Sequence, residues 1–172
     1  LSNHEHFTAL REYAEKTNSS ALLVLKDEKL LFEWYAPGFS KTSVTNSMSM
    51  AKTVLALALG IAIDEKTIAS ESDVLGRYFS EWAADERGKI SLQDLLQMRE
   101  LFDFDNSTQN PFSGVAQLHF SDDVASLVLA SQYKTTAERK FDYSNLNPQV
   151  IGMVVERATR KRYADFLSEK LW

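Results

Sequence analysis

The sequence predicts a mixed α/β (α+β) fold in which a β-hairpin near the N-terminus precedes a mainly helical portion. Two short apolar runs flank a polar turn within residues 21–35, and after residue 40 the chain reads almost entirely as helix and loop. The 172 residues suffice for one domain with a core and are too few to argue for two. We therefore expect a single domain over 1–172, with a helix and hairpin in 1–40 and a mainly helical part in 41–172.

The hairpin follows a predicted amphipathic helix over residues 5–16. Residues 21–25 form an apolar run consistent with a buried strand, a polar turn follows at 27–29, and residues 30–35 form a second strand rich in aromatic side chains. A two-stranded hairpin alone is marginally stable in water, so it must join a larger sheet. We expect its partner strands to lie outside this chain, which makes the predicted domain incomplete.

The remaining segments carry helix signals. Residues 49–64 are apolar nearly all round, which predicts a helix buried on most sides. Ser91 and Asp94 have the spacing of a capping box for a helix that ends near residue 98. Asn147 and Pro148 suit the cap and the first position of a later helix. Further helices are predicted over residues 72–79, 121–132 and 163–172.

Composition excludes several classes of function. The net charge of −5 and the scattered basic residues argue against nucleic acid or an anionic membrane as a partner. No apolar run approaches the ~20 residues of a membrane span. The absence of cysteine excludes thiolate chemistry and cysteine-based zinc sites. His4 and His6 are best explained as exposed polar residues near the terminus, and His119 stands alone, so we expect neither a metal site nor a histidine-dependent triad.

Ser49 and Lys52 form an S-x-x-K motif at a predicted helix start. Residues three apart lie about one turn along the same helix face, so the hydroxyl and the amine can meet. A serine is a weak nucleophile until a base takes its proton, and a lysine amine does so when burial or a neighbour lowers its pKa. The alternative is helix capping alone, for which Ser49 and Lys52 are equally suitable.

Tyr143 and Asn145 form a Y-x-N motif before a helix cap. Tyr143 could relay a proton, and the Asn145 side chain could donate to a substrate amide while contacting Lys52. The alternative is a simple turn with Tyr143 packed in the core. The presence of both motifs in this order favours the chemical interpretation, with Ser49, Lys52 and Tyr143 as catalytic residues and Asn145 as a substrate-binding residue.

These motifs and their surroundings resemble the serine β-lactamase and penicillin-binding-protein superfamily, and more closely its class C-like branch. That branch also contains esterases, D-aminopeptidases and 6-aminohexanoate-dimer hydrolase-like enzymes. The resemblance implies a β-lactamase/transpeptidase-like fold, an acylated Ser49, Lys52 as its proton partner, and Tyr143 with Asn145 as the second catalytic element. It implies no metal or organic cofactor. It covers the opening hairpin and residues 46–52, 55–68, 78–82, 90–98, 143–147 and 163–172.

The chain departs from the family pattern at three loops. Arg99-Glu100-Leu101-Phe102 replaces a Thr-Ser-Gly-Leu-like turn, Ala137-Glu138 replaces Pro-Gly, and Arg160 stands where glycine is usual. Glycine serves where the backbone needs a positive φ, so these loops are expected to differ in shape. The family's third motif, a Lys/His-x-Gly on a strand, would follow Trp172. We therefore expect this chain to be the N-terminal portion of a larger fold and its C-terminal remainder to be a partner.

Two functions remain open at this point. The first is a serine hydrolase that cleaves a small-molecule amide or ester through a covalent acyl-enzyme on Ser49. The second is a catalytically silent penicillin-binding-like relative, or a fragment, that acts as a binding module. The compartment cannot be derived from the residues, and a periplasmic or secreted location is favoured only by analogy with the family.

Overall fold

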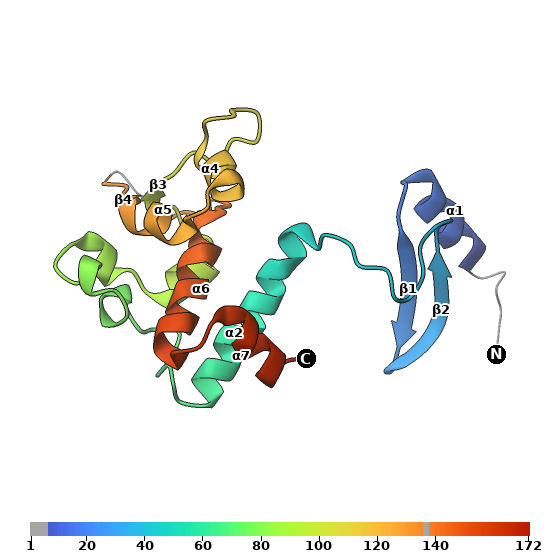
Figure 1. The fold of residues 1–172 in the computed structure, drawn as a ribbon, viewed down its shortest axis with the longest axis horizontal. Coiled ribbons are helices and arrows are strands. Elements are labelled where there is room, and N and C mark those ends of the chain that lie inside the picture. The colour runs from blue at the N-terminus through green and yellow to red at the C-terminus, as the bar shows by residue number, and fades with distance from the viewer. Residues whose placement is uncertain (1–6, 136–137) are drawn as a thin grey trace. The chain divides into compact units, whose positions relative to one another are not determined.

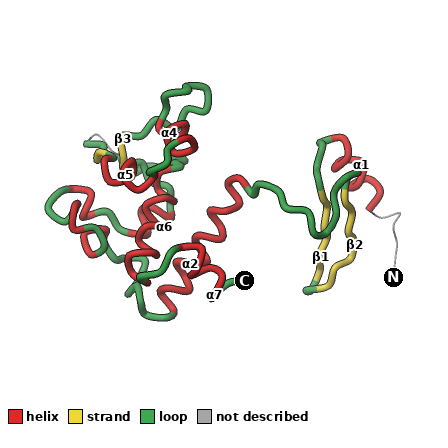
Figure 2. The backbone as a smooth tube through the Cα atoms, in the orientation of Figure 1, coloured by secondary structure: helices red, strands yellow, loops and turns green. Residues whose placement is uncertain are grey.

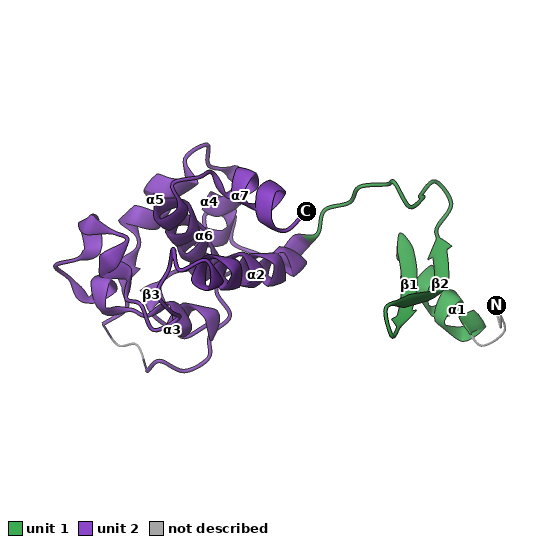
Figure 3. Ribbon diagram, turned by 90° about the horizontal axis from the view of Figure 1, so that it is seen from below, with its two compact units in different colours: residues 1–47 green, residues 48–172 purple. Residues whose placement is uncertain are grey.

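The structure, a computed structural model, describes residues 7–135 and 138–172 and divides into two compact units. The first unit ends at Ser47 and the second is Met48–Trp172 (Figure 3). The sequence placed this change at residue 40, in the segment that joins the hairpin to the first helix of the second unit. The expectation of a single domain stays a prediction, and each unit is described by itself.

The first unit contains α1 (Thr8–Lys16) and an antiparallel hairpin of β1 (Ala21–Lys26) and β2 (Lys29–Tyr35), as Figure 1 shows. Asp27 and Glu28 connect the strands with φ values of 49° and 62°. Positive φ at both turn residues matches the right-handed twist of the flanking strands, which favours a tight hairpin. The predicted hairpin is therefore confirmed.

The prediction that the first strand is buried is wrong for the described structure. Leu23 on β1 is 48% exposed and Leu25 is 62% exposed, and Leu30 and Leu31 on β2 are each 49% exposed. The reason is that β1 and β2 form a two-stranded sheet, and no third strand of the described ranges pairs with them. A ring stack between Phe7 and Phe32, with centroids 5.1 Å apart, covers only part of the apolar surface.

The second unit is built around α2 (Ala51–Asp64) and α6 (Leu146–Thr159), which pack against each other (Figure 1). Further contacts to this pair come from α3 (Leu92–Leu96), α5 (Val124–Ala130) and α7 (Tyr163–Lys170). Helices and loops make up most of this unit (Figure 2). The largest fully buried side chains of its core include Leu59, Leu75, Phe79, Trp82, Leu92, Leu95, Leu101, Leu146 and Phe166.

Two predicted helices differ from the observed ones. The buried side chains of α2 are Leu55, Ala58, Leu59 and Ala62, whose spacing defines one helix face, while Leu57 is 52% exposed. The helix is therefore not buried on most sides. The segment predicted as a helix over 72–79 forms only a 3-10 turn, Leu75–Arg77. Just before it, Val74 is extended, with φ −95° and ψ 149°, and pairs with Ser91 in an antiparallel bridge, so the backbone is not helical there.

Helix starts show where local signals succeed and fail. The predicted capping box is confirmed, because the Ser91 hydroxyl accepts from the N–H of Asp94 while the Asp94 side chain accepts from the N–H of Ser91. The predicted cap at Asn147 is wrong, because α6 begins earlier and its cap is Asn145. Three short elements were not predicted from the sequence, namely β3 (Phe102–Asp103), α4 (Gly114–Phe120) and β4 (Gln132–Tyr133).

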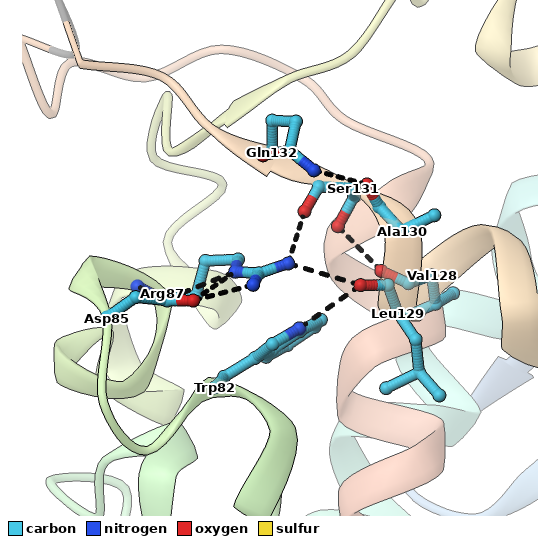
Figure 4. A network of polar contacts seen from close by, with 8 residues as sticks. All are labelled: Trp82, Asp85, Arg87, Val128, Leu129, Ala130, Ser131 and Gln132. Atoms are coloured by element: carbon cyan, nitrogen blue, oxygen red, sulfur yellow. Dashed lines mark hydrogen bonds and ion pairs between the residues drawn. The ribbon is translucent and has the colours of Figure 1, made fainter.

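A polar network joins the 3-10 turns of residues 80–89 to the end of α5 (Figure 4). Arg87 donates to the carbonyls of Leu129 and Ser131 at 3.1 and 2.8 Å. The Trp82 indole N–H also donates to the Leu129 carbonyl at 3.2 Å. These bonds satisfy carbonyls that the end of a helix leaves without intrahelical partners. They tie α5 to the segment that supplies the buried Trp82.

Helices able to span a bilayer are absent from residues 7–135 and 138–172, where each helix is too short or too polar.

Candidate active site

Ser49 lies in a 3-10 turn, Met48–Met50, directly before α2, and Lys52 is the second residue of that helix. Lys52 Nζ donates to the Ser49 hydroxyl at 3.2 Å. Met48 enters the turn with a φ of 47°, a left-handed conformation that is uncommon for a residue with a side chain. The motif spacing therefore brings hydroxyl and amine together, with locally strained backbone just before the serine.

Tyr143 approaches the same hydroxyl from a distant part of the chain. Its phenol donates to Ser49 Oγ at 2.8 Å, and Lys52 Nζ lies 5.0 Å from the centre of its ring. The hydrogen bond with Ser49, followed by the hydrogen bond and charge of Lys52, lowers the pKa of Tyr143. Ser49 thus has two neighbouring groups that can exchange a proton with it.

Asn145 completes the cluster. Its side-chain carbonyl accepts a hydrogen bond from Lys52 Nζ at 2.9 Å, so Lys52 lies between Ser49 and Asn145. The structure therefore brings together all four site residues named from the sequence. Ser49 and Tyr143 are exposed, and Lys52 and Asn145 are half-buried, so within the described residues the site is open to solvent.

The packing of α2 on α6 explains why the two motifs meet. Lys52 is at the start of α2, and Tyr143 and Asn145 immediately precede α6. Leu55 and Gly152 lie close enough that a Cβ on Gly152 would be 3.9 Å from a Leu55 methyl. The buried faces of the two helices thus fix the separation of their beginnings.

Arg99 and Glu100, which depart from the family pattern, form hydrogen bonds with the segment that carries Tyr143. The N–H of Glu100 donates to the carbonyl of Lys140 at 2.9 Å, and Arg99 donates to the carbonyl of Arg139 at 2.8 Å. The Glu100 carboxylate pairs with Lys134, which lowers the pKa of Glu100. The departure therefore adds charged side chains next to the site without separating the two motifs.

The other two departures have different outcomes. Ala137 lies outside the described residues. Arg160 ends α6 with a φ of 55°, so the backbone there has the left-handed conformation that glycine adopts most readily. The expected change of loop shape is thus not seen at the end of α6, where arginine takes the conformation of a glycine.

The chain also matches a known protein family over most of its length. The model of the family described as Beta-lactamase matches residues 7–172. The chain belongs to the Beta-lactamase family. The resemblance to the serine β-lactamase and penicillin-binding-protein superfamily is therefore confirmed.

Individual relatives of this Beta-lactamase family chain include the 6-aminohexanoate-dimer hydrolase of Paenarthrobacter ureafaciens. It is 29% identical over 176 residues, an alignment that covers 95% of this chain and 44% of that protein. Among solved structures, a Bacillus anthracis protein that carries the name of a 6-aminohexanoate-dimer hydrolase matches with a TM-score of 0.80 at 18% identity, over 95% of this chain and 46% of that one. A Bacteroides dorei protein named as a β-lactamase matches with a TM-score of 0.72 at 20% identity, over 96% and 50%.

These matches confirm the β-lactamase-like fold class, a mixture of helix and sheet. The chain spans about half the length of the relatives it matches, at 44%, 46% and 50%.

One residue of the candidate site, Asn106, was not predicted from the sequence. The side-chain carbonyl of Asn106 accepts the backbone N–H of Asn145 at 3.0 Å. Asn106 belongs to a loop without periodicity and to no motif, so no signal in the sequence could have identified it.

His119, the histidine within the described residues, makes its hydrogen bond away from the candidate site. A ring nitrogen of His119 lies 2.9 Å from the carbonyl of Val115 within α4, and His4 and His6 lie outside the described residues. In the ranges that the structure describes, no three histidine, aspartate or glutamate side chains are grouped to hold a metal ion.

Proposed function

We propose that this Beta-lactamase family protein is a serine hydrolase that cleaves an amide or ester through an acyl-enzyme on Ser49. The observation that carries the proposal is the position of Ser49 Oγ, which lies 3.2 Å from Lys52 Nζ and 2.8 Å from Tyr143 Oη. A nucleophile within hydrogen-bond reach of a base, which is itself oriented by a third group, is typical of covalent catalysis. Asn145 is that third group, since it accepts from Lys52.

In the first half of the reaction, Ser49 Oγ attacks the substrate carbonyl carbon and its proton passes to the neutral amine of Lys52 or to the phenolate of Tyr143. The proton is then delivered to the leaving amine or alcohol as the scissile bond breaks, leaving an ester on Ser49. In the second half, water attacks that ester, the bond between the acyl carbon and Ser49 Oγ breaks, the carboxylic acid is released, and a proton from the water returns to the serine oxygen. Backbone N–H groups at the beginning of α2 are the candidate donors to the oxyanion.

The first substrate to test is a linear amide. The Paenarthrobacter ureafaciens relative is named for the 6-aminohexanoate dimer, and this chain shares 29% of its residues over the aligned length. The exposure of Ser49 in the described residues is compatible with an extended substrate. We propose an amide of that class, with carboxylic esters as the next candidate.

The proposal is tested by labelling the complete gene product with a fluorophosphonate probe and digesting it for mass spectrometry. We expect a single adduct on the peptide that contains Ser49. Ser49→Ala should abolish the adduct, whereas Ser47→Ala, two residues away in the same peptide, should retain it. A protein that is folded and unlabelled, or an adduct that persists in Ser49→Ala, would contradict the enzyme proposal and favour a binding module.

The substrate class is tested by turnover of three probes, namely the 6-aminohexanoate dimer, a short p-nitrophenyl ester and nitrocefin. The proposal expects Ser49-dependent hydrolysis of the dimer or the ester. Labelled enzyme that hydrolyses only nitrocefin would show a β-lactamase and would refute the linear-amide assignment.

A further inference from the structure

The position of Asn145 depends on a contact that none of the sequence motifs contains. Asn145 stands at the cap of α6, yet its side chain makes no capping hydrogen bond. The Ser144 hydroxyl accepts from the N–H groups of Leu146 and Asn147 instead, at 3.1 and 3.4 Å. The Asn145 side chain is therefore available to accept from Lys52.

The backbone of Asn145 is held by a hydrogen bond with Asn106. The Asn106 side-chain oxygen accepts the Asn145 N–H at 3.0 Å, although 39 residues separate the two. This bond restrains the peptide group from which the Asn145 side chain extends. A shift of that peptide group would move the oxygen to which Lys52 donates.

Asn106 is itself held in place by its loop. The Asp105 carboxylate accepts from the N–H of Ser107 at 2.8 Å and from the side-chain amide of Asn110 at 3.0 Å. The Asp105 carbonyl accepts from the N–H of Val115, the second residue of α4, at 3.2 Å. The hydrogen bonds of Asp105 thus restrain the loop residues on both sides of Asn106.

The Lys52 side chain is flexible, so its position depends on the hydrogen bonds that restrain it. A lysine side chain has several rotatable bonds and loses rotamer entropy when it is fixed in one position. Its hydrogen bonds to Ser49 and Asn145 select the position in which it can exchange a proton with the serine. A loosened Asn145 would leave Lys52 free to sample positions from which Ser49 is out of reach.

We propose that Asn106 is a positioning residue of the active site, which orients Lys52 toward Ser49 through the backbone of Asn145. The catalytic consequence rests on the proposed function, because it concerns the proton transfer from Ser49. The geometric consequence, that Asn106 fixes Asn145 and Lys52, does not depend on turnover.

The test uses three variants of the complete gene product. Asn106→Leu removes the acceptor at similar size, and Asn106→Asp keeps an oxygen that can accept from the Asn145 N–H. Asn110→Ala loosens the same loop by removing the side-chain bonds of Asn110 with Asp105 and with the N–H of Phe112, and Asn110 has no bond to Asn145. Each variant is compared with the parent for the rate of fluorophosphonate labelling of Ser49.

We expect Asn106→Leu to slow labelling about tenfold, the loss expected when one orienting hydrogen bond is removed. Asn106→Asp should recover most of the rate, because its carboxylate oxygen can accept from the Asn145 N–H. Asn110→Ala, which leaves the contact between Asn106 and Asn145 in place, should label faster than Asn106→Leu. Parent-like labelling by Asn106→Leu, or equal losses in all three variants, would overturn the proposal.

A second readout is independent of catalysis. NMR of the same proteins follows hydrogen exchange of the Asn145 amide and the resonance of the Lys52 ε-carbon. Asn106→Leu should accelerate the exchange and shift the resonance, whereas Asn110→Ala should change the resonance little. If both signals are unchanged in Asn106→Leu, the inference is wrong whatever the labelling shows. If both signals change in Asn106→Leu although Ser49 of the parent protein cannot be labelled, only the proposed function is contradicted.

Discussion

At the scale of single residues, the pKa of Tyr143 depends on two other residues of the candidate site, Ser49 and Lys52. Its hydrogen bond with Ser49 and the nearby Lys52 lower the pKa of Tyr143 and favour its phenolate. A phenolate could take the Ser49 proton, while Lys52 keeps the charge of the pair balanced. By contrast, burial and the Asp73 carboxylate raise the pKa of Tyr78, so the tyrosines of this chain titrate at different pH.

We predict that Ser49→Ala and Lys52→Met each raise the pKa of Tyr143, because each removes a group that stabilises the phenolate. The folded pKa of Tyr143 lies below the unfolded value of about 10. Its contribution to folding stability is therefore present above about pH 10 and is lost as the pH falls through the folded pKa. Tyrosinate absorbance during a pH titration measures the change.

The control for that titration is Tyr143→Phe, which should remove the earliest tyrosinate step from the curve. The same variant should slow labelling of Ser49 by about a hundredfold if the phenol takes part in proton transfer. A titration curve that is identical in the parent and in Lys52→Met would contradict the assigned role of Lys52.

At the scale of elements, carbonyl groups at the end of α5 accept hydrogen bonds from Arg87, which belongs to another segment of the chain. Arg87 donates to two carbonyls there, pairs with Asp85 through both carboxylate oxygens, and lies 5.2 Å from the centre of the Trp82 ring. Its side chain is only 16% exposed. The interaction between α5 and residues 80–89 is therefore a charge-assisted clamp over a buried aromatic side chain (Figure 4).

We predict that Arg87→Met lowers the free energy of unfolding by about 2 kcal/mol, because two half-buried carbonyls lose their charged donor while the apolar stem over Trp82 is kept. Urea denaturation measures this change. The matched control is Arg162→Met, whose side chain is 81% exposed and 3.9 Å from Asp165, and which should cost less than about 0.5 kcal/mol. Equal effects of the two variants would contradict the clamp.

At the scale of the whole molecule, stability should depend on carboxylates that hold ionic and hydrogen-bonded contacts. The main cause at Glu81 is its hydrogen bonding with Arg157, which lowers the pKa of Glu81 to about 2. At Asp73 burial acts to raise the pKa, but hydrogen bonds from Tyr78 and Ala69 outweigh it and the pKa is lowered. The same direction holds for Asp85, Glu100, Asp123 and Glu169.

We predict that the protein loses stability as the pH falls from about 4.5 toward about 2. Since the folded pKa values lie below the unfolded ones, these contributions are present above the unfolded pKa and are lost as the carboxylates become protonated in the folded state. Urea unfolding across this range measures the slope. Glu81→Gln and Arg157→Met should flatten it to a similar extent, because each removes the same ion pair, and an unchanged slope in both would contradict the prediction.

Features that depend on neighbouring residues were well predicted from the sequence. Three such features are the hairpin of β1 and β2, the capping box of Ser91 with Asp94, and the approach of Lys52 to Ser49. Each of them depends on residues that are close together in the sequence. The predicted helix over 72–79 and the cap at Asn147 were wrong, because the pairing of Val74 with Ser91 and the hydroxyl of Ser144 compete with those local signals.

By itself, then, the sequence predicted four candidate site residues and determined how Ser49 faces Lys52, since residues three apart must lie about one turn apart on a helix. Only the tertiary structure decided that Tyr143 and Asn145 reach that pair and that Asn106 supports them. These contacts join segments 39 to 94 residues apart. Their geometry comes from the packing of α2 against α6, which depends on the shape of a whole core and on no local spacing.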